Sequence, residues 1–298
     1  RALLIFCADN GVVEEGVSQT GQEVTAAVVS NMTRGRSCSC RMAEKAETDV
    51  FPIDIGIACE VEHQGKLHPL TERKIRRGTS NFTKEAAMTR QEVLTAVLTG
   101  IDAVRVLKDR EYRLFTVGEM GIGNTTTSSA VASVLLRKEP ELVTGCGAGL
   151  DLAGLKRKTK AIRRGIDLHQ PDPMDGMDVL QKVGGFDLAA MAGAFLGGAI
   201  YHVPVVIDGV IAAAAAAAAG RIAPAATDYM LAAHVSAEPA SIWLLDLIGV
   251  TPAIRAGLRL GEGTGALALF PLLDMALSIY RDMDTFAEME IEEYKPLV

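Results

Sequence analysis

Short apolar runs alternate with longer helical patterns along this chain. Runs of about four to eight β-branched or apolar residues are typical of buried strands, and stretches of helical length, amphipathic or rich in alanine, lie between them. The predicted strands are Leu3–Ala8, Val50–Ile57, Arg113–Val117, Val203–Ile207 and Tyr229–Ala233. The predicted helices include Gln22–Met32, Met88–Leu107, Thr125–Leu136, Leu155–Asp167 and Asp187–Ile200. This alternation predicts an α/β fold with a parallel sheet.

Two further segments shape the predicted domains. The most apolar one, Val203–Ala219, is interrupted by a proline and an Asp-Gly pair, so we expect a buried strand followed by a helix. The part from about Ala253 to the end is expected to be entirely helical. We therefore divide the chain into a large Rossmann-like domain, residues 1–252, that carries the site, and a helical segment, residues 253–298, that covers it.

The first predicted strand starts almost at the first residue of the sequence. A buried strand is a poor place for a natural terminus, because terminal residues are usually exposed. We therefore expect a further N-terminal segment before Arg1 in the complete protein.

The composition argues against several classes of partner. The chain has 298 residues, of which 49% are hydrophobic and 22% charged, and its formal net charge is −7. It lacks both the run of roughly 18 apolar residues that a membrane helix needs and a basic stripe interleaved with aromatic residues, so neither a membrane nor a nucleic acid is expected as a partner. The 5 cysteines show no metal-ligand spacing, which favours a reducing cytoplasm.

Polar and glycine-rich clusters follow several of the predicted strands. They are Ala8–Gly11, Gly118–Thr127, Asp208–Gly209 and Ala232–Pro239. Ligands of open α/β sheets bind outside the carboxyl ends of the strands, so these clusters predict one composite site.

The cluster Gly118–Thr127 is the strongest candidate for a phosphate site. Asn124 and Thr125 offer amide and hydroxyl groups where a helix is expected to begin, at Thr125. Free N–H groups and the dipole at a helix start favour an anion. The pattern is neither a P-loop nor a dinucleotide fingerprint. An ordinary capped turn between strand and helix is the alternative.

Positive charge for an anionic ligand is concentrated after the loop Gly145–Asp151. This loop leads into a helix with a basic cluster that includes Lys158. Ser236 adds a hydroxyl donor from another strand end. Taken alone, these residues are equally well explained by a flexible loop before a charged helix and by a helix cap.

Two carboxylates in glycine-rich surroundings are candidate proton acceptors. Glu262 stands between two glycines, and Glu119 lies in the run Gly118–Gly121. Partial desolvation would raise the pKa of such a carboxyl group toward that of a useful general base. Together with the phosphate donors, they favour group transfer by positioning and proton removal. A solvated loop glutamate is the alternative.

The ordered set of motifs resembles the nicotinate-nucleotide:dimethylbenzimidazole phosphoribosyltransferase family, which makes the lower nucleotide loop of cobamides. The similar segments cover nearly the whole chain. They are Ala8–Val13, Gly16–Ser18, Gln22–Thr25, Gly118–Thr127, Gly184–Phe186 with Ala189–Gly193, Val206–Gly209, His234–Pro239 and Leu260–Ala266. The resemblance implies a doubly wound α/β domain, a small helical domain built from both chain ends, and a homodimer.

The resemblance also implies a reaction that needs no cofactor or metal. Ribose phosphate passes from nicotinate mononucleotide to an aromatic base. The glycosidic nitrogen of the donor is quaternary, so nicotinate leaves without an acid, whereas the incoming azole loses an N–H proton and needs a base. Attack from the opposite ring face gives an α-riboside. By position, Glu262 is the general base and Glu119 supports it.

The remaining assignments follow from the matching positions. Residues at or near the phosphate and ribose are Gly121, Asn124, Lys158, Asp208 and Ser236, to which the motif analysis adds Thr125. Residues around the planar base are Ser18, Gln22, Met120 and Leu260.

Two stretches depart from the family pattern. Gln19-Thr20-Gly21 stands where the family commonly has an aromatic residue and a proline, so a stacking surface is lost and the preferred base stays open among dimethylbenzimidazole, related azoles, adenine and phenols. The stretch Arg34–Cys40 is more polar than expected and receives no function.

Two other functions compete with the one that the resemblance implies. They are a dinucleotide-binding oxidoreductase and a subunit of a heteromeric pair.

Overall fold

A single sheet of parallel strands organises the computed structural model, which describes residues 1–147, 149–292 and 294–295. The strands are β1 (Ala2–Ala8), β2 (Asp49–Gly56), β3 (Thr71–Glu72), β4 (Phe115–Met120), β5 (Val205–Ile207) and β6 (Met230–Ala232). Their spatial order is β3-β2-β1-β4-β5-β6, which is that of a doubly wound sheet. The expected α/β fold is confirmed, and all the strand pairs of this sheet are parallel.

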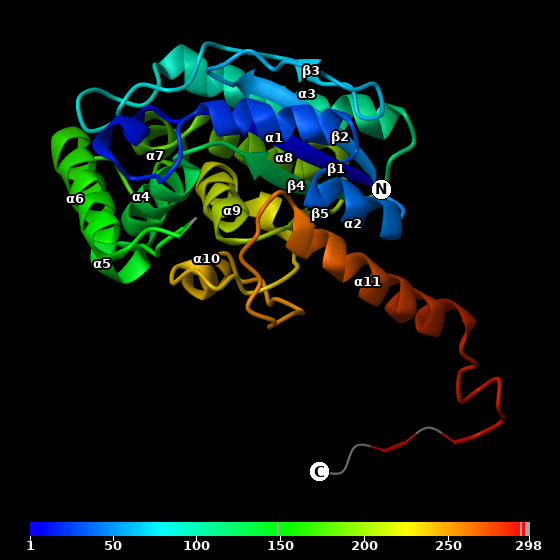
Figure 1. Ribbon diagram of the computed structural model, residues 1–298. Coiled ribbons are helices and arrows are strands. Elements are labelled where there is room, and N and C mark those ends of the chain that lie inside the picture. The colour runs from blue at the N-terminus through cyan, green and yellow to red at the C-terminus, as the bar shows by residue number, and fades with distance from the viewer. Residues whose placement is uncertain (148, 293, 296–298) are drawn as a thin grey trace.

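Helices cover both faces of the sheet (Figure 1). On the side of the larger core lie α3 (Arg90–Asp109), α4 (Asn124–Leu136), α5 (Pro140–Val143), α6 (Leu152–His169), α7 (Gly176–Val183), α8 (Phe186–Tyr201), α9 (Val210–Ile222) and α10 (Ser241–Leu247). The smaller core lies under α1 (Glu23–Thr33), α2 (Cys38–Lys45) and the beginning of α11 (Thr264–Asp282). Short 3-10 turns occur at η1 (Gly11–Glu15) and η2 (Pro224–Tyr229). None of the described helices has both the length and the apolar character needed to cross a membrane.

Strand β1 shows why the central strands read as continuous apolar runs. Leu4 and Phe6 belong to the larger core, whereas Leu3 and Ile5 belong to the smaller core on the opposite face. Successive side chains of a strand point to opposite faces, and here both faces are covered. No position of β1 therefore needs a polar side chain.

Each predicted strand and helix corresponds to an element of the structure, with shifts of a few residues at the ends. Val203–Ala219 divides into β5 and most of α9, as expected. β3, α2, α5, α7 and α10 were not predicted from the sequence. Strand β3 escaped notice because its two residues are exposed and polar, so they show no apolar pattern.

The chain from Ala253 onward is not entirely helical, contrary to the expectation. Residues 253–263 form an irregular loop, which a bridge between His234 and Ile254 joins to the segment after β6. Glycines at positive φ within this loop explain why it does not continue as a helix. After its buried beginning, α11 extends away from the rest of the protein (Figure 1). Residues 293 and 296–298 of the predicted helical segment lie outside the described residues.

Candidate active site

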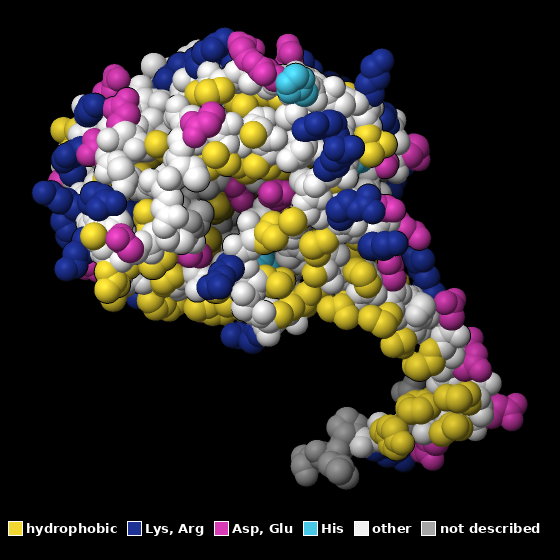
Figure 2. All heavy atoms as spheres, viewed as in Figure 1, with side chains coloured by type: hydrophobic (Ala, Val, Ile, Leu, Met, Phe, Trp, Pro, Cys, Tyr) yellow, Lys and Arg dark blue, Asp and Glu magenta, His cyan; other side chains and the backbone are white. Residues whose placement is uncertain are grey.

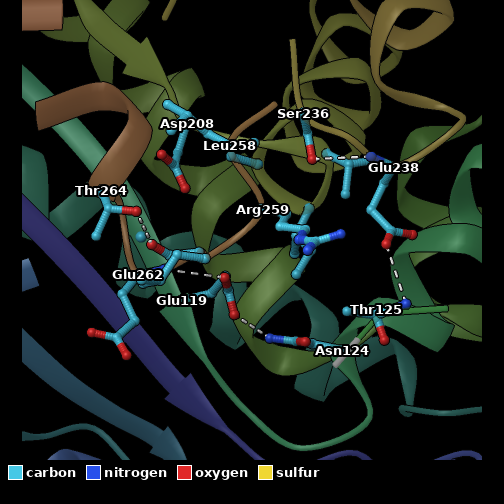
Figure 3. Close-up of a pocket in the computed structure, with 18 of the residues that line it drawn as sticks. Glu119, Asn124, Thr125, Asp208, Ser236, Glu238, Leu258, Arg259, Glu262 and Thr264 are labelled. Atoms are coloured by element: carbon cyan, nitrogen blue, oxygen red, sulfur yellow. Dashed lines mark hydrogen bonds between the residues drawn. The ribbon is translucent and has the colours of Figure 1, made fainter. Parts of the chain in front are cut away.

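A cavity of about 200 Å³ lies at the carboxyl ends of β4, β5 and β6. Its walls come from these strand ends, the start of α4 and the loop before α11 (Figure 3). In Figure 2, a hollow on this face of the protein has acidic side chains inside it. The residues assigned from the sequence that line the cavity are Glu119, Met120, Gly121, Asn124, Thr125, Asp208, Ser236, Leu260 and Glu262. The clusters after β4, β5 and β6 thus share one site, whereas Ala8–Gly11, the cluster after β1, does not line the cavity.

Glu262 is placed by an uncommon backbone conformation. Gly261, Glu262 and Gly263 have φ angles of 89°, 56° and 80°, so the three consecutive residues are left-handed. A non-glycine residue in this region is strained, and such residues cluster at functional sites. A Cβ atom on Gly261 would lie 2.7 Å from Oε1 of Glu119, and one on Gly263 would lie 2.5 Å from Leu3. The two glycines therefore allow the Glu262 backbone to approach the end of β4.

Glu119 lies at the end of β4 and is almost fully buried. Its Oε1 accepts the backbone N–H of Glu262 at 3.4 Å, and its Oε2 accepts the side-chain amide of Asn124. Burial raises the pKa of Glu119 well above its ordinary value, and Asp187 and Asp208 raise it further. Glu119 therefore keeps its proton to a higher pH than an exposed glutamate. The carboxyl groups of Glu119 and Glu262 point in different directions (Figure 3), so they can contact different parts of a ligand.

Asp208 connects the end of β5 to the start of α11. Its Oδ1 accepts the backbone N–H of Ala266 at 3.0 Å and lies 3.8 Å from Nε2 of His234. Burial raises the pKa of Asp208, while His234 opposes that rise. Ser236, also buried, accepts the backbone N–H of Glu238 at 3.4 Å through its Oγ. Asp208 therefore both lines the cavity and fixes the position of α11, which forms part of its wall.

The expected phosphate donors meet at the start of α4. This helix begins at Asn124, one residue earlier than predicted, after Gly123 with a φ of 97°. The Nζ of Lys158 donates to Oγ1 of Thr125 at 3.0 Å and to the carbonyl of Gly145 at 3.1 Å. Lys158 is fully buried behind Thr125, so it brings charge close to the cavity without lining it. Ala148, in the same loop, lies outside the described residues.

Burial also changes the titration of Lys158. It lowers the pKa of this side chain to about 8, although Glu238 acts in the opposite direction. A bound anion near Thr125 would favour the charged form, because opposite charges stabilise each other most strongly away from water. The ammonium group is therefore sensitive to the charge of a ligand at the start of α4.

The residues assigned to the base lie in different surroundings. Met120 and Leu260 line the main cavity, and Ser18 lines a smaller neighbouring pocket. Gln22 precedes α1, and its Nε2 donates to the carbonyl of Asn10 at 3.5 Å. Between them, Gln19 donates through its side chain to the carbonyl of Gly149, which ties the loop that lacks the aromatic residue to the loop before α6.

The structure adds residues that the sequence analysis did not single out. Arg259, Glu238 and Leu258 line the cavity, and Figure 3 shows the first two near Thr125 and Ser236. All three lie within or directly beside a predicted motif, and this proximity was the signal in the sequence that could have identified them as site residues. Ser39, on α2, donates a hydrogen bond to Glu262, and it lay in the stretch to which no function was given.

Several known proteins are similar to this chain along nearly its whole length. A sequence model described as a phosphoribosyltransferase family matches residues 1–291. A nicotinate-nucleotide–dimethylbenzimidazole phosphoribosyltransferase of Clostridium acetobutylicum is 46% identical over 297 residues, which are 100% of this chain and 83% of that protein. One of the same name from Acetivibrio thermocellus is 43% identical over 298 residues, which are 100% of this chain and 84% of that protein. The crystal structure of CobT from Thermus thermophilus superimposes with a TM-score of 0.92 at 38% identity, covering 98% of this chain and 86% of that chain.

Proposed function

Since this chain belongs to the family of nicotinate-nucleotide–dimethylbenzimidazole phosphoribosyltransferases, we propose that it transfers 5-phosphoribose from nicotinate mononucleotide to dimethylbenzimidazole or a related azole. The products are nicotinate and an α-riboside phosphate, which serves cobalamin biosynthesis. The observation that carries the proposal is the placement of Glu262 at the cavity wall, bonded through its backbone to the buried Glu119.

The proposed chemistry needs one proton acceptor. A nitrogen of the azole attacks C1′ of the ribose, and the bond from C1′ to the nicotinate nitrogen breaks with its electron pair going to that nitrogen. The azole N–H proton passes to the Glu262 carboxylate. The nicotinate nitrogen is positively charged in the donor and neutral in the product, so its departure requires no acid. Glu119, whose pKa is raised by burial, can donate a hydrogen bond to the ligand when protonated or stabilise positive charge on the ribose when ionised.

The start of α4 is proposed to hold the ribose phosphate. Gly121, Asn124 and Thr125 line the cavity there, and the positive end of the helix dipole favours an anion. The backbone N–H groups of Asn124, Thr126 and Thr127 already donate to the carbonyl groups of Gly121 and Gly123. Lys158 supplies the charge from behind Thr125. Asp208 and Ser236 stand at the neighbouring strand ends, where their oxygens can accept ribose hydroxyl groups.

The base is proposed to lie against Met120 and Leu260, with Ser18 in the neighbouring pocket. Gln22 lines neither pocket, so its contact with the base is proposed from its matching position in the family alone. The side chain of Leu260 is 56% exposed, so it can provide an apolar surface for a planar ring. The nearby loop offers polar side chains in place of an aromatic ring. This composition supports a broad choice of base, including adenine.

We also propose a homodimer and a cytoplasmic location. Leu272, Met275 and Ile279 are exposed on the part of α11 that extends from the body, and Figure 2 shows hydrophobic side chains gathered along it. Such a surface is typical of an interface.

The cysteines are free thiols, in agreement with a reducing compartment. The division into residues 1–252 and 253–298 is retained as a proposal, with the loop before α11 covering the site.

The direct test is an assay of both products. The protein is incubated with nicotinate mononucleotide and, one at a time, dimethylbenzimidazole, other benzimidazoles, adenine and phenols. We expect nicotinate and the α-riboside phosphate to form in equal amounts and only when a base is present. Failure to release nicotinate with any base would refute the proposed function. Activity that appears only after a second, similar subunit is added would support the heteromeric alternative.

A further inference from the structure

Ser39 contacts the proposed general base from a distant part of the chain. It lies on α2, it is fully buried, and its Oγ is 2.9 Å from Oε2 of Glu262. The two residues are 223 positions apart in the sequence. The contact exists because α2 and α11 pack together on the same face of the sheet, so the loop before α11 passes the start of α2.

The direction of this hydrogen bond follows from the groups involved. An ionised carboxylate only accepts, so Ser39 donates its single hydroxyl hydrogen to Glu262. The Ser39 oxygen can then accept from Oγ of Ser37, 2.7 Å away, and that oxygen accepts the backbone N–H of Cys40 at 3.2 Å. A chain of donors therefore runs from the start of α2 to Glu262. A hydrogen bond to a charged acceptor is stronger than one between neutral groups, so the Ser39 hydroxyl holds the carboxylate oxygen in place.

We propose that Ser39 is a positioning residue that holds the Glu262 carboxylate in one orientation before the base binds. The inference rests on the proposed function of Glu262. Glu119 fixes the backbone of Glu262 through a hydrogen bond to its N–H group. Among the described residues, it is the Ser39 hydroxyl that donates a hydrogen bond to the Glu262 carboxylate. Without that hydroxyl, the side chain would be free to rotate between staggered conformations.

Other ionisable groups face Glu262 and have to be separated from the effect of Ser39. Glu119 faces it from β4 and Cys40 from α2, and burial raises the pKa of each. Asp208 and Asp187 act on Glu119 in turn. A control variant should leave all of these groups unchanged. Ser30→Ala meets this condition, because Ser30 is a buried serine on α1 whose hydroxyl donates to the carbonyl of His63.

The experiment compares Ser39→Ala, Ser30→Ala and the unmodified protein in the assay with nicotinate mononucleotide and dimethylbenzimidazole. Ser39→Ala should lower kcat about tenfold, because it removes a hydrogen bond to a charged group. The KM for nicotinate mononucleotide should stay within about twofold, since the phosphate site is elsewhere. Ser30→Ala should behave as the unmodified protein.

A second comparison separates positioning from a general structural role. Ser39→Ala should cause no further loss in a Glu262→Gln background, because residues that act as a unit are not additive. An unchanged kcat in Ser39→Ala would overturn the proposal, and so would an equal loss in both backgrounds. If the unmodified protein released no nicotinate, the proposed function itself would fail, which is a different result from an active protein that is indifferent to Ser39.

Discussion

The backbone N–H of Glu262 donates to Oε1 of Glu119 across 3.4 Å, and this bond joins the loop before α11 to the end of β4. The two carboxylates come from residues 143 positions apart. Their proximity is therefore a property of the doubly wound sheet, which ends β4 beside the loop, and of the glycines around Glu262. Predictions about Glu119 and Glu262 therefore concern one structural unit of the site.

Replacing Glu262 by glutamine should slow transfer by about 10²-fold or more, the usual loss when a positioned base is removed. Glutamine keeps the size of the side chain and can still accept from Ser39, so the thermal unfolding temperature should hardly change. Rates with dimethylbenzimidazole across a range of pH are the measurement. Near-normal turnover with the original pH dependence would show that another group takes the proton.

Lys158→Met should weaken the use of nicotinate mononucleotide by roughly tenfold or more while hardly affecting nicotinate riboside, which has no phosphate. Methionine retains most of the buried volume but not the charge. The comparison of kcat/KM for the two donors is decisive, because a general loss of structure would affect both. Equal losses would place Lys158 outside the phosphate site.

The affinity for nicotinate mononucleotide should fall as the pH rises above about 8, which is the pKa of Lys158. Below that pH the side chain is charged and attracts the phosphate, whereas above it the neutral amine offers no charge. Binding would then require uptake of a proton, which costs about tenfold in affinity for each further pH unit. The KM of the unmodified protein should show this alkaline limb and that of Lys158→Met should not. A KM that is flat from pH 7 to 9 would contradict the assignment.

Asp187→Asn should increase stability more at pH 7 than at pH 4. Burial raises the pKa of Asp187 from the ordinary 3.8 to about 7 in the folded protein. Between these values the folded state binds more protons than the unfolded state, so stability falls as the pH rises through this window. Asparagine does not titrate, and its side-chain oxygen can still accept the N–H of Leu188. The difference in Tm between variant and unmodified protein should therefore grow with pH.

The control for Asp187 is Asp246→Asn, which makes the same charge change on the exposed surface of α10. Its effect on Tm should vary little between pH 4 and 7. A difference for Asp187→Asn that also stays constant across this range would mean that Asp187 ionises normally in the folded protein.

The loop Gln19-Thr20-Gly21 should make the enzyme tolerant of different bases. Aromatic stacking contributes about 0.5–1.5 kcal/mol, so its absence should bring several azoles, and adenine with them, within about tenfold in kcat/KM. Thr20→Tyr combined with Gly21→Pro should sharpen the preference for dimethylbenzimidazole. Competition between equimolar bases measures this directly. Strong preference in the unmodified protein would instead assign the discrimination to residues such as Met120 and Leu260.

The fold could be predicted from the sequence because its strands are buried on both faces. β1 has to be apolar at each position, and that run is visible without a structure. β3 is confined to Thr71 and Glu72 at the exposed edge, so nothing in its sequence marks it. Residues 253–263 were predicted to be helical, but they form a loop. Their glycines were interpreted as ligand-binding residues, whereas in the structure they have positive φ angles that end any helix.

The site could be predicted only as far as its residues sit in recognisable motifs. Glu119 and Asn124 belong to the glycine-rich cluster after the predicted strand that became β4, so their place in the site followed from the sheet topology. Glu262 follows no strand and was assigned from its glycine-flanked setting and from the family resemblance. The bond from Ser39 to Glu262 depends on the packing of α2 near α11, which no local pattern encodes. The burial of Lys158 behind Thr125 likewise arises from tertiary packing, whereas the basic stretch of helix indicated only that positive charge is available for an anionic ligand.

Gly261, Glu262 and Gly263 all have a left-handed backbone conformation. The position of the Glu262 carboxylate therefore depends on two glycines that have no functional group of their own. Because the space around both glycines is occupied by Glu119 and Leu3, even an added methyl group would push the loop outward. Such a change would leave every acid, base and donor of the site chemically intact and still move the carboxylate from its target. In a catalogue of inactive variants, these two positions would look catalytic although neither glycine takes part in the chemistry.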